Sequence, residues 1–406
     1  MSEIGFVTAR PVSIRLNRKA SSLVRRGHPW VYAGGLERCR ESADSNGLGV
    51  LYDEKNDFLG VGLYDPKSPI IVRLVSRERG VAIDSTYWRV RLAEALSRRT
   101  SDVIGGETNG YRIINGESDG WPGLVFDRYG DVGVIKIYVP FWATQAEQLR
   151  ELFATLPWVN SLVLRYSGKA EEPAKRAGLE QGMILQGKDC GEQAVFLESG
   201  IRFEANVIQG QKTGFFLDQR ENRRRVRDMA SGASVCNLFS FSGAFSLYAA
   251  RGGAKRLLDV DISQHALTSA RRNRELNDSL TPIAEASFRY QKADAFQWIA
   301  GEREVYDLMI VDPPSFARKA ADVPKAISAY RFLAKSAAKR VSKNGLLVLA
   351  SCSAHISTAA FVEAVGEEVK RCWGNMQIVT QSEHAPDHPA TFNEAKYLKC
   401  LFLRRS

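Results

Sequence analysis

The stretch SVCNLFSFSG, residues 234–243, decides the fold of the larger part of this chain. Its first six residues form a short, mostly apolar run, which predicts a strand over 234–239. The small residues that follow lead into a predicted helix over 243–251, and small side chains at such a turn let a ligand approach the backbone at the helix N-terminus. The stretch does not match the pattern G-x-G-x-x-G, so a plain dinucleotide-binding fingerprint is not supported.

The same alternation of strand and helix continues on the C-terminal side of this stretch. Apolar runs that read as strands alternate with longer segments of helical character. The predicted strands cover 256–260, 307–311 and 346–350, and the predicted helices cover 264–277 and 325–341. Strands this apolar are buried on both faces, as in a parallel sheet with helices on either side. We therefore expect a doubly wound, Rossmann-like α/β domain over 196–406.

The chain before residue 196 has a different sequence pattern. Residues 1–80 carry short apolar runs separated by Gly, Pro, Asn and Asp, which is typical of a small β-rich barrel or sandwich. Residues 81–195 contain a predicted helix over 85–99, with Asp84 or Ser85 as its N-cap, together with strands and a second helix. We therefore expect a β-rich domain over 1–80 and a small α+β domain over 81–195.

Composition narrows the classes of function. The 406 residues carry a formal net charge of +10, which favours attraction to polyanions such as RNA but is a weak indication alone. Six cysteines without C-x-x-C spacing argue against a zinc site or a disulfide framework and for a reducing cytoplasm. No stretch approaches the roughly 20 apolar residues of a membrane span. The N-terminus lacks the pattern of a secretory signal.

Acidic residues stand at two strand ends of the predicted α/β domain, where ligands of open α/β sheets bind. Asp261 follows the second strand, where a carboxylate can accept hydrogen bonds from two ribose hydroxyls. The alternative is that Asp261 or Ser263 caps the next helix. Asp294 lies in segment 292–296, after a third strand expected between those over 256–260 and 307–311. A carboxylate there could read an adenine amino group, and helix capping is again the alternative.

Two further strand ends carry residues with chemistry of their own. Asp312 is followed by two prolines, which fix the backbone and hold the carboxylate at the mouth of the strand. Cys352 follows the fifth strand, so we expect it at the ligand edge of the sheet, across the cleft from Asp312. The alternative for Cys352 is a small buried apolar residue, the commonest fate of a free cysteine. We expect Cys236 and Cys400 to be packing residues of that kind.

Together, these motifs resemble a known family, the PUA-containing class I methyltransferases that make 5-methylcytosine in large-subunit ribosomal RNA. GHPWVY is similar to the PUA domain of that family, and GESDGWPGL and DRYGD are similar to its central domain. QKTGFFLDQR resembles the element that enters the catalytic domain, and NLFSFSG resembles the cofactor loop. DPP and SCS occupy the positions where the family has its substrate-site motifs, and DHP and YLK match the C-terminal end of the family. The segments are 27–32, 116–124, 127–131, 211–220, 237–243, 312–314, 351–353, 387–389 and 397–399.

The resemblance implies a covalent reaction. Cytosine C5 is a poor nucleophile, and a cysteine thiolate that adds to C6 makes the ring enamine-like, so that C5 can attack a methyl donor. Cys352 is then the nucleophile and Asp312 its catalytic partner. Asp312 either donates to N3 as a neutral acid or accepts from the exocyclic amine as an anion. The base that removes the C5 proton is Asp312 or a water molecule. The sequence leaves both choices open.

The resemblance also implies the ligands. S-adenosylmethionine is the expected cofactor. Its expected contacts come from Phe239, Ser240, Gly243, Asp261, Ile262, Asp294, Ala295, Asp312, Lys212, Asp218 and Arg220. The target base would leave its stack and lie against Pro313, Pro314 and Phe316, with core packing as the alternative for Phe316.

This chain departs from the family at two positions, and two other functions stay open. Ser315 stands where the family usually has a basic residue, and His355 stands where small or apolar residues are usual. Both departures affect how the target nucleotide is held more than the reaction type. One other function is nitrogen methylation of guanine by a sister group without the cysteine. The other is RNA binding or ribosome assembly without turnover. As partners we expect ribosomal RNA or a ribosomal precursor, no membrane and no metal, with a homodimer left open.

Overall fold

The structure is a computed structural model that describes residue 6, residues 11–40 and residues 47–406. It divides into two compact units whose chain segments interleave. The first unit comprises Met1–Ser199, Ala205–Leu217 and Pro386–Phe392, and the second comprises Gly200–Glu204, Asp218–Ala385 and Asn393–Ser406. The expected boundaries at 1–80, 81–195 and 196–406 stay a prediction, because this division follows compactness alone. Among the described residues, no helix combines the length and apolar character needed to cross a membrane.

The first unit begins with a β-rich domain, as expected. Its six-stranded sheet has the order β2-β6-β5-β4-β1-β3, in which only β1 and β4 pair in parallel. The strands are β1 (Val12–Leu16), β2 (Trp30–Tyr32), β3 (Leu36–Arg40), β4 (Leu48–Tyr52), β5 (Phe58–Tyr64) and β6 (Ile70–Ser76). Helix α1 (Arg18–Arg25) begins after Asn17, whose side chain accepts a hydrogen bond from the Ala20 amide.

A five-stranded sheet with helices follows in the same unit and confirms the expected α+β character. The sheet order is β11-β10-β9-β8-β7. Its strands are β7 (Gly110–Asn115), β8 (Leu124–Tyr129), β9 (Val132–Ile137), β10 (Ser161–Tyr166) and β11 (Met183–Gly187). The helices are α2 (Ser85–Ser97), α3 (Ser101–Ile104), α4 (Pro140–Ala143), α5 (Ala146–Phe153) and α6 (Glu171–Arg176). Asp84 caps α2, as one of the two expected alternatives had it.

Buried tryptophans form the centre of this α+β domain. Trp88 of α2 packs against Trp121 and Trp142, with ring centroids 4.7 and 5.0 Å away. All three side chains have no exposed surface. Only one face of the five-stranded sheet joins this core, and its side chains include Ile135, Ile137, Leu162 and Leu164. Side chains alternate between the faces along a strand, so the other face carries the charged Asp127, Lys136 and Arg165 beside the buried Val134 and Val163.

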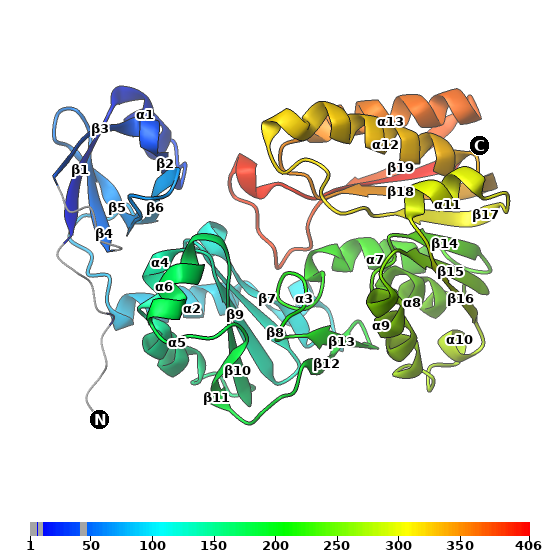
Figure 1. Ribbon diagram of the computed structural model, residues 1–406, viewed down its shortest axis with the longest axis horizontal. Helices are drawn as coiled ribbons and strands as arrows, with labels where there is room; N and C mark the ends of the chain where they lie inside the picture. Colours follow the sequence, from blue (N-terminus) through cyan, green and yellow to red (C-terminus); the bar gives the residue numbers. More distant parts are fainter. Residues whose placement is uncertain (1–5, 7–10, 41–46) are drawn as a thin grey trace. The chain divides into compact units, whose positions relative to one another are not determined.

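Strands β12 (Gln193–Glu198) and β13 (Ile201–Asn206) form a two-stranded sheet before the seven-stranded sheet of the second unit. The seven-stranded order is β16-β15-β14-β17-β18-β20-β19, with β14 to β18 parallel and β20 antiparallel to its neighbours (Figure 1). The strands are β14 (Ser234–Leu238), β15 (Arg256–Asp261), β16 (Ser287–Lys292), β17 (Tyr306–Val311), β18 (Val341–Ser351), β19 (Met376–Ser382) and β20 (Lys399–Arg405). This arrangement confirms the expected doubly wound domain.

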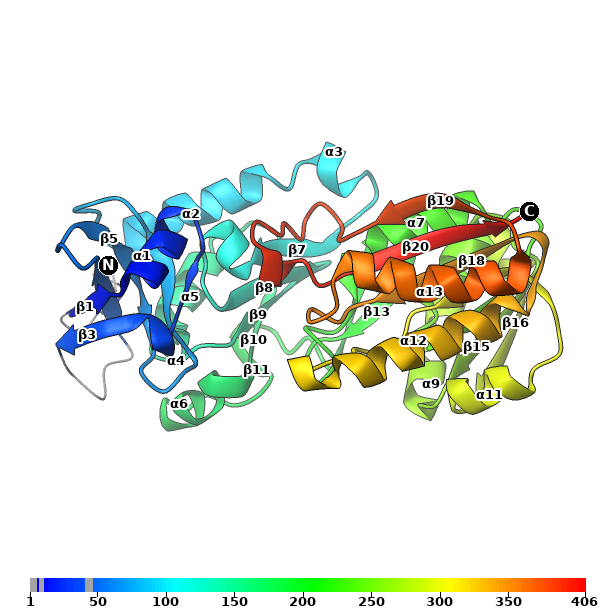
Figure 2. The ribbon, with the colours of Figure 1, turned by 90° about the horizontal axis from the view of Figure 1, so that it is seen from above.

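Helices cover both faces of this sheet. Helices α12 and α13 lie side by side over one face, as Figure 2 shows, and α7, α8 and α9 lie over the other. The helices are α7 (Arg220–Asp228), α8 (Ala244–Arg251), α9 (Gln264–Glu275), α10 (Thr281–Ala284), α11 (Ala295–Gly301), α12 (Val323–Ala338) and α13 (Thr358–Trp373). Strand β14 is buried along its whole length, as a strand between two helical layers must be.

Candidate active site

The turn between β14 and α8 has an unusual backbone. Phe239, Phe241 and Gly243 adopt positive φ angles of 58°, 47° and 72°. Left-handed backbone is costly for residues other than glycine and persists where the surroundings enforce it, often at ligand sites. Two backbone bonds hold the turn, from the Ser240 amide to the Val260 carbonyl at 3.1 Å and from the Gly243 amide to the Ser240 carbonyl at 2.9 Å.

The same turn fits the expected cofactor. A Cβ at position 243 would lie 2.9 Å from the Ala270 Cβ, so only glycine lets α8 approach α9 this closely. The hydroxyl oxygens of Ser240 and Ser242 are buried and have no hydrogen-bond partner among the described residues. Buried hydroxyls normally find a partner, so two orphaned ones at a strand end indicate a polar ligand.

Asp261 holds this turn from the neighbouring strand end. Its carboxylate accepts from the Phe241 amide at 2.9 Å and from the Ser263 amide at 2.8 Å. Ser263, and not Asp261, caps α9, since the Ser263 hydroxyl accepts from the Ala266 amide. Each carboxylate oxygen has a second lone pair, so Asp261 can still accept from ribose hydroxyls. Ile262 beside it is 65% exposed, which leaves an apolar surface for a flat ring.

Asp294 caps a helix, which was the alternative considered for it. Its Oδ1 accepts from the Gln297 amide at 3.0 Å and opens α11. Ala295 is buried beneath this cap. A contact from Asp294 or Ala295 to an adenine ring stays a prediction.

Asp312 follows β17 and is half-buried at the end of a chain of polar groups. The Gln219 Nε2 donates to the Asp312 Oδ2 at 3.0 Å, and the Gln219 Oε1 accepts from the Asn222 Nδ2 at 2.6 Å. The Ser382 hydroxyl in turn donates to the Asn222 Oδ1 at 2.5 Å. An amide donor aimed at Oδ2 favours the ionised, accepting form of Asp312 over a neutral acid. Gln219 was not among the expected site residues, although it lies between Asp218 and Arg220.

Cys352 lies at the end of the strand beside β17. Its Sγ is 4.0 Å from the carbonyl oxygen of Pro313, so the thiol and the Asp-Pro-Pro turn are neighbours. Cys352 is half-buried, whereas Cys236 and Cys400 have no exposed surface and are packing residues, as expected. The thiol therefore stands at the carboxyl edge of the sheet, where a ligand can reach it.

Lys399 of β20 is a buried cation in the same place. It is directly opposite Ser351 across the β18–β20 pair, is 2% exposed, and donates from Nζ to the Ser353 carbonyl oxygen at 2.6 Å. Burial lowers the pKa of Lys399 to about 8, against the opposing effect of the nearby Cys352 and Glu383. From the sequence, Lys399 is recognisable only as part of a C-terminal motif, because its position opposite Ser351 depends on an antiparallel strand pair that the strand–helix pattern does not predict.

The turns that follow β17 and β18 are tied together through Ser353. Its hydroxyl lies 3.1 Å from the Ser315 hydroxyl and 3.2 Å from the Tyr330 hydroxyl. Burial raises the pKa of Tyr330 to about 12. Ser315, where the family usually has a basic residue, thus connects the two turns. His355 Nε2 is 3.1 Å from the Arg318 carbonyl oxygen.

The remaining expected substrate residues differ in their surroundings. Pro313 is buried and Pro314 is exposed. The half-buried Phe316 packs its ring 5.0 Å from Tyr330 and 5.8 Å from Phe296. Core packing, the alternative considered for Phe316, therefore accounts for part of its environment.

The three expected residues of segment 211–220 are divided between the units. Asp218 is buried and accepts from the Tyr397 hydroxyl at 2.7 Å. Arg220 has no exposed surface and places its Nε 3.2 Å from a Glu221 oxygen. Lys212 belongs to the first unit, where its Nζ lies 4.6 Å from the centre of the Phe216 ring.

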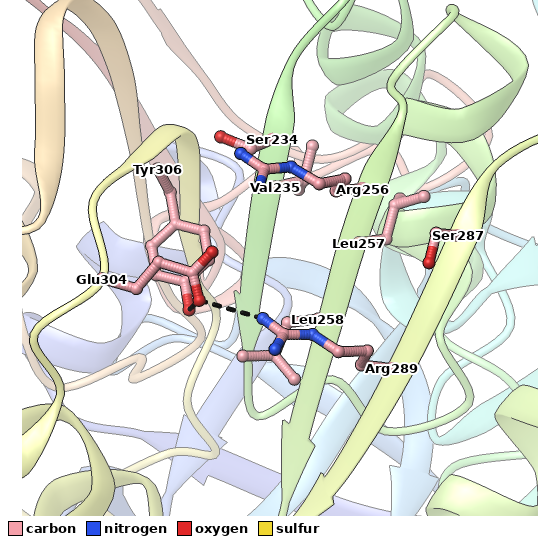
Figure 3. Close-up of a pocket in the computed structure, with 9 residues that line it drawn as sticks. All are labelled: Ser234, Val235, Arg256, Leu257, Leu258, Ser287, Arg289, Glu304 and Tyr306. Carbon is pink, nitrogen blue, oxygen red and sulfur yellow. Dashed lines mark hydrogen bonds and ion pairs between the residues drawn. The ribbon is translucent and has the colours of Figure 1, made fainter.

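A pocket of about 240 Å³ lies at the amino ends of the parallel strands of the seven-stranded sheet (Figure 3). It is lined at the starts of β14 to β17 by residues that include Arg256, Tyr306 and the ion pair of Arg289 with Glu304, 2.9 Å apart. Ligands of open α/β sheets bind at the carboxyl ends of the strands. The expected residues that follow β14 to β18, among them Asp261, Asp312 and Cys352, lie at those ends and not at this pocket.

Comparison with known proteins agrees with this geometry. A family model described as S-adenosylmethionine-dependent methyltransferase matches residues 181–404, and a PUA-like domain model matches residues 14–77. A ribosomal RNA large subunit methyltransferase of Deinococcus radiodurans is 45% identical over 405 residues, which cover 98% of each chain. Ribosomal RNA large subunit methyltransferase I of Aliivibrio fischeri is 31% identical over 400 residues, covering 96% of this chain and 98% of the relative.

A solved structure shows the same fold. The crystal structure of SMU.776 complexed with SAH superposes with a TM-score of 0.80 at 22% identity and covers 97% of this chain and 99% of that one. S-adenosylmethionine is accordingly the cofactor, and the turn with its orphaned hydroxyls is suited to hold it. The chain belongs to the S-adenosylmethionine-dependent methyltransferase family, in the group with a PUA-like domain whose relatives are named ribosomal RNA large subunit methyltransferases.

Proposed function

We propose that this protein methylates C5 of a cytosine in large-subunit ribosomal RNA, with Cys352 as the covalent nucleophile. The observation that carries the proposal is the half-buried thiol of Cys352, 4.0 Å from the Pro313 carbonyl at the carboxyl edge of the sheet. The names of its relatives support the RNA substrate. A cytoplasmic location is part of this proposal.

The reaction balances with the residues at this edge. S-adenosylmethionine supplies the electrophilic methyl group when bound. The Cys352 thiol loses its proton to solvent, and its sulfur bonds to C6 while the C5–C6 electron pair moves to C5. C5 would then bond to the methyl group, whose bond to the sulfonium sulfur would break, and S-adenosylhomocysteine would leave. Removal of the C5 proton by Asp312 or a water molecule restores the double bond as the S–C6 bond breaks.

In this reaction Lys399 acts on the nucleophile and Asp312 acts on the target base. Lys399 places a cation beside Cys352, and a nearby positive charge favours a thiolate over a thiol. Asp312, held by the Gln219 amide, has an anionic carboxylate that can accept from the exocyclic amine of cytosine. That hydrogen bond would orient the ring with C6 toward the sulfur.

A covalent adduct tests the proposal. Wild-type protein, S-adenosylmethionine and large-subunit ribosomal RNA containing 5-fluorocytidine should give a protein–RNA adduct that survives denaturing electrophoresis, since fluorine at C5 cannot leave as a proton. Cys352→Ala should give none. Cys190→Ala is the matched control, because Cys190 is another half-buried cysteine but lies in the first unit, and it should form the adduct normally.

Other outcomes would overturn the proposal in recognisable ways. Undiminished methylation of normal RNA by Cys352→Ala would rule out the covalent mechanism. A product methylated on a guanine nitrogen would favour the sister group of enzymes. RNA binding without any methyl transfer by the wild-type protein would favour the non-catalytic alternative.

A further inference from the structure

The five-stranded sheet of the first unit carries an unusual pair of cations on the face that is turned away from the tryptophan core. Lys136 of β9 and Arg165 of β10 are direct partners in a parallel register, so their side chains leave the sheet on the same side. Their neighbours Ile135, Ile137 and Leu164 point to the opposite side, into the tryptophan core. The two cations therefore lie on the face that the core does not use.

Arg165 is buried and has no counter-ion among the described residues. The residue is 4% exposed, and its Nε and Nη1 atoms have no hydrogen-bond acceptor in the part of the chain that the structure describes. Arginine is almost never buried without a partner, because the guanidinium loses its hydration. A planar guanidinium presents a fork of N–H donors that matches the oxygens of a phosphate. The missing partner is therefore an anion with at least two oxygens.

The neighbouring charges leave this arginine uncompensated. Asp127 is the acid on this face, and it is already engaged by Arg112, with an ion pair of 2.8 Å, and by the Thr213 hydroxyl. Lys136 is half-buried and donates from Nζ to the Lys212 carbonyl oxygen at 2.7 Å. Burial lowers the pKa of Lys136 to about 8, and the nearby Arg165 and Arg112 add to that effect. An anion bound here would relieve this repulsion.

Segments of the same unit surround the pair. The Thr213 hydroxyl lies 2.8 Å from the Tyr129 hydroxyl, which fixes the segment after β13 against this face. The Gly182 amide donates to the Leu164 carbonyl, next to Arg165, and a Cβ on Gly182 would touch Ile208. Tyr138, two residues beyond Lys136, is 39% exposed and gives the pair an aromatic neighbour at the surface.

We propose that Arg165 and Lys136 form a binding site for a phosphodiester group of the RNA substrate, in the α+β domain and apart from the methyl-transfer residues. The site is defined by the orphaned Arg165 donors. The assignment of its ligand to RNA rests on the proposed function. A phosphate held here would position the RNA without reading its bases.

RNA binding tests the ligand. Binding of a fluorescein-labelled transcript of large-subunit ribosomal RNA should weaken about tenfold in Arg165→Gln, the effect of losing a hydrogen-bonded charge. The slope of log Kd against log salt concentration should fall by about 0.7. Arg165→Lys should keep the slope but lose affinity, because it keeps the charge and loses the fork. Arg176→Gln, which removes an exposed arginine of the same unit, should change neither by a comparable amount.

A second measurement tests the site without RNA. Inorganic phosphate at constant ionic strength should raise the Tm of the wild-type protein and of Arg176→Gln, and should leave that of Arg165→Gln unchanged. Without phosphate, Arg165→Gln should be at least as stable as wild type, since it removes an unpaired buried charge. S-adenosylmethionine binding, measured by calorimetry, should be equal in all variants.

The two measurements separate failure of the site from failure of the proposed function. Unchanged RNA affinity and salt slope in Arg165→Gln would overturn the inference, as would a loss of S-adenosylmethionine binding with RNA binding intact. Absence of RNA binding by the wild-type protein would instead refute the proposed function. A phosphate-dependent Tm shift that Arg165→Gln abolishes would then still support an oxyanion site.

Discussion

Lys399 shows how one buried side chain couples the proposed nucleophile to the stability of the fold. Its ammonium group has exchanged water for a single 2.6 Å bond to the Ser353 carbonyl. The charged form is therefore penalised in the folded state, which is why the pKa falls to about 8 from its ordinary 10.5. This buried ammonium group lies near Cys352, where its positive charge would stabilise the thiolate that the proposed mechanism requires.

The lowered pKa of Lys399 gives a pH dependence with a definite sign. Between about pH 8 and pH 10.5 the unfolded chain binds the proton more tightly than the folded one, so stability should rise with pH in this window. In Lys399→Met, the increase in unfolding free energy across this pH window should be smaller than in the wild type by about 1–3 kcal/mol. Urea unfolding at pH 7.0 and pH 9.5 measures it, with the exposed Lys396→Met as control. An identical pH dependence in Lys399→Met and wild type would contradict the assignment.

The strand-to-helix turn after β14 is the element on which cofactor binding depends. Positive φ at Phe239, Phe241 and Gly243 compresses the turn, and the Asp261 carboxylate locks it by accepting from the Phe241 amide. The Ser240 and Ser242 hydroxyls of this turn are buried and have no hydrogen-bond partner among the residues that the structure describes. A ligand that satisfies these hydroxyls should therefore also stabilise the turn.

Gly243→Ala should distort this turn. The added Cβ would meet Ala270 at 2.9 Å and Asp259 at 3.1 Å, in addition to the cost of a left-handed alanine. We expect at least a tenfold loss of S-adenosylmethionine affinity by calorimetry and a loss of about 1–3 kcal/mol in unfolding free energy.

Gly232→Ala is the matched control for this prediction. Gly232 has the same φ of 72°, but a Cβ there would have nothing within 4 Å. It should therefore lose stability for backbone reasons alone and bind the cofactor normally. Equal cofactor affinities in the two variants would show that the close packing at Gly243 is not what shapes the site.

Elements with a strong local signal were predictable, and others were not. Strand β14 is buried throughout and mostly apolar, and α2 has a capping residue, Asp84, at its start. Strand β16 lies at an edge and is largely exposed, so its sequence has no apolar run. Strands β19 and β20 form an antiparallel extension, which the alternating strand–helix pattern does not imply.

At the scale of the whole molecule, the chain passes between its two units more than once. Segment Pro386–Phe392 is part of the first unit, although Asp218–Ala385 of the second unit separates it from the preceding segment of the first unit in the sequence. The Asp387 carboxylate accepts from the Arg112 amide at 2.9 Å, and the Pro389 carbonyl accepts from the Asn115 side chain at 2.8 Å. The Asp-His-Pro motif therefore has a structural role within the first unit.

Asp387→Ala should therefore destabilise the first unit. The substitution leaves the buried Arg112 amide without its acceptor, which costs about 1–3 kcal/mol. Hydrogen exchange followed by mass spectrometry should show faster exchange in β7, where Arg112 lies. Asp387→Asn keeps a side-chain oxygen and should cost less. Unchanged protection of β7 in Asp387→Ala would remove the proposed role of this motif.

The doubly wound domain, the β-rich N-terminal domain and the strand ends that carry Asp261, Asp312 and Cys352 were all predictable from the amino-acid pattern. They were predictable because apolar periodicity and turn residues act locally, and strand order then follows general rules for α/β sheets. Only the tertiary structure brought Lys399 beside Cys352, joined Gln219 to Asp312 and left Arg165 without a counter-ion. Those relations depend on pairing between residues distant in sequence, and on burial, which no local pattern encodes.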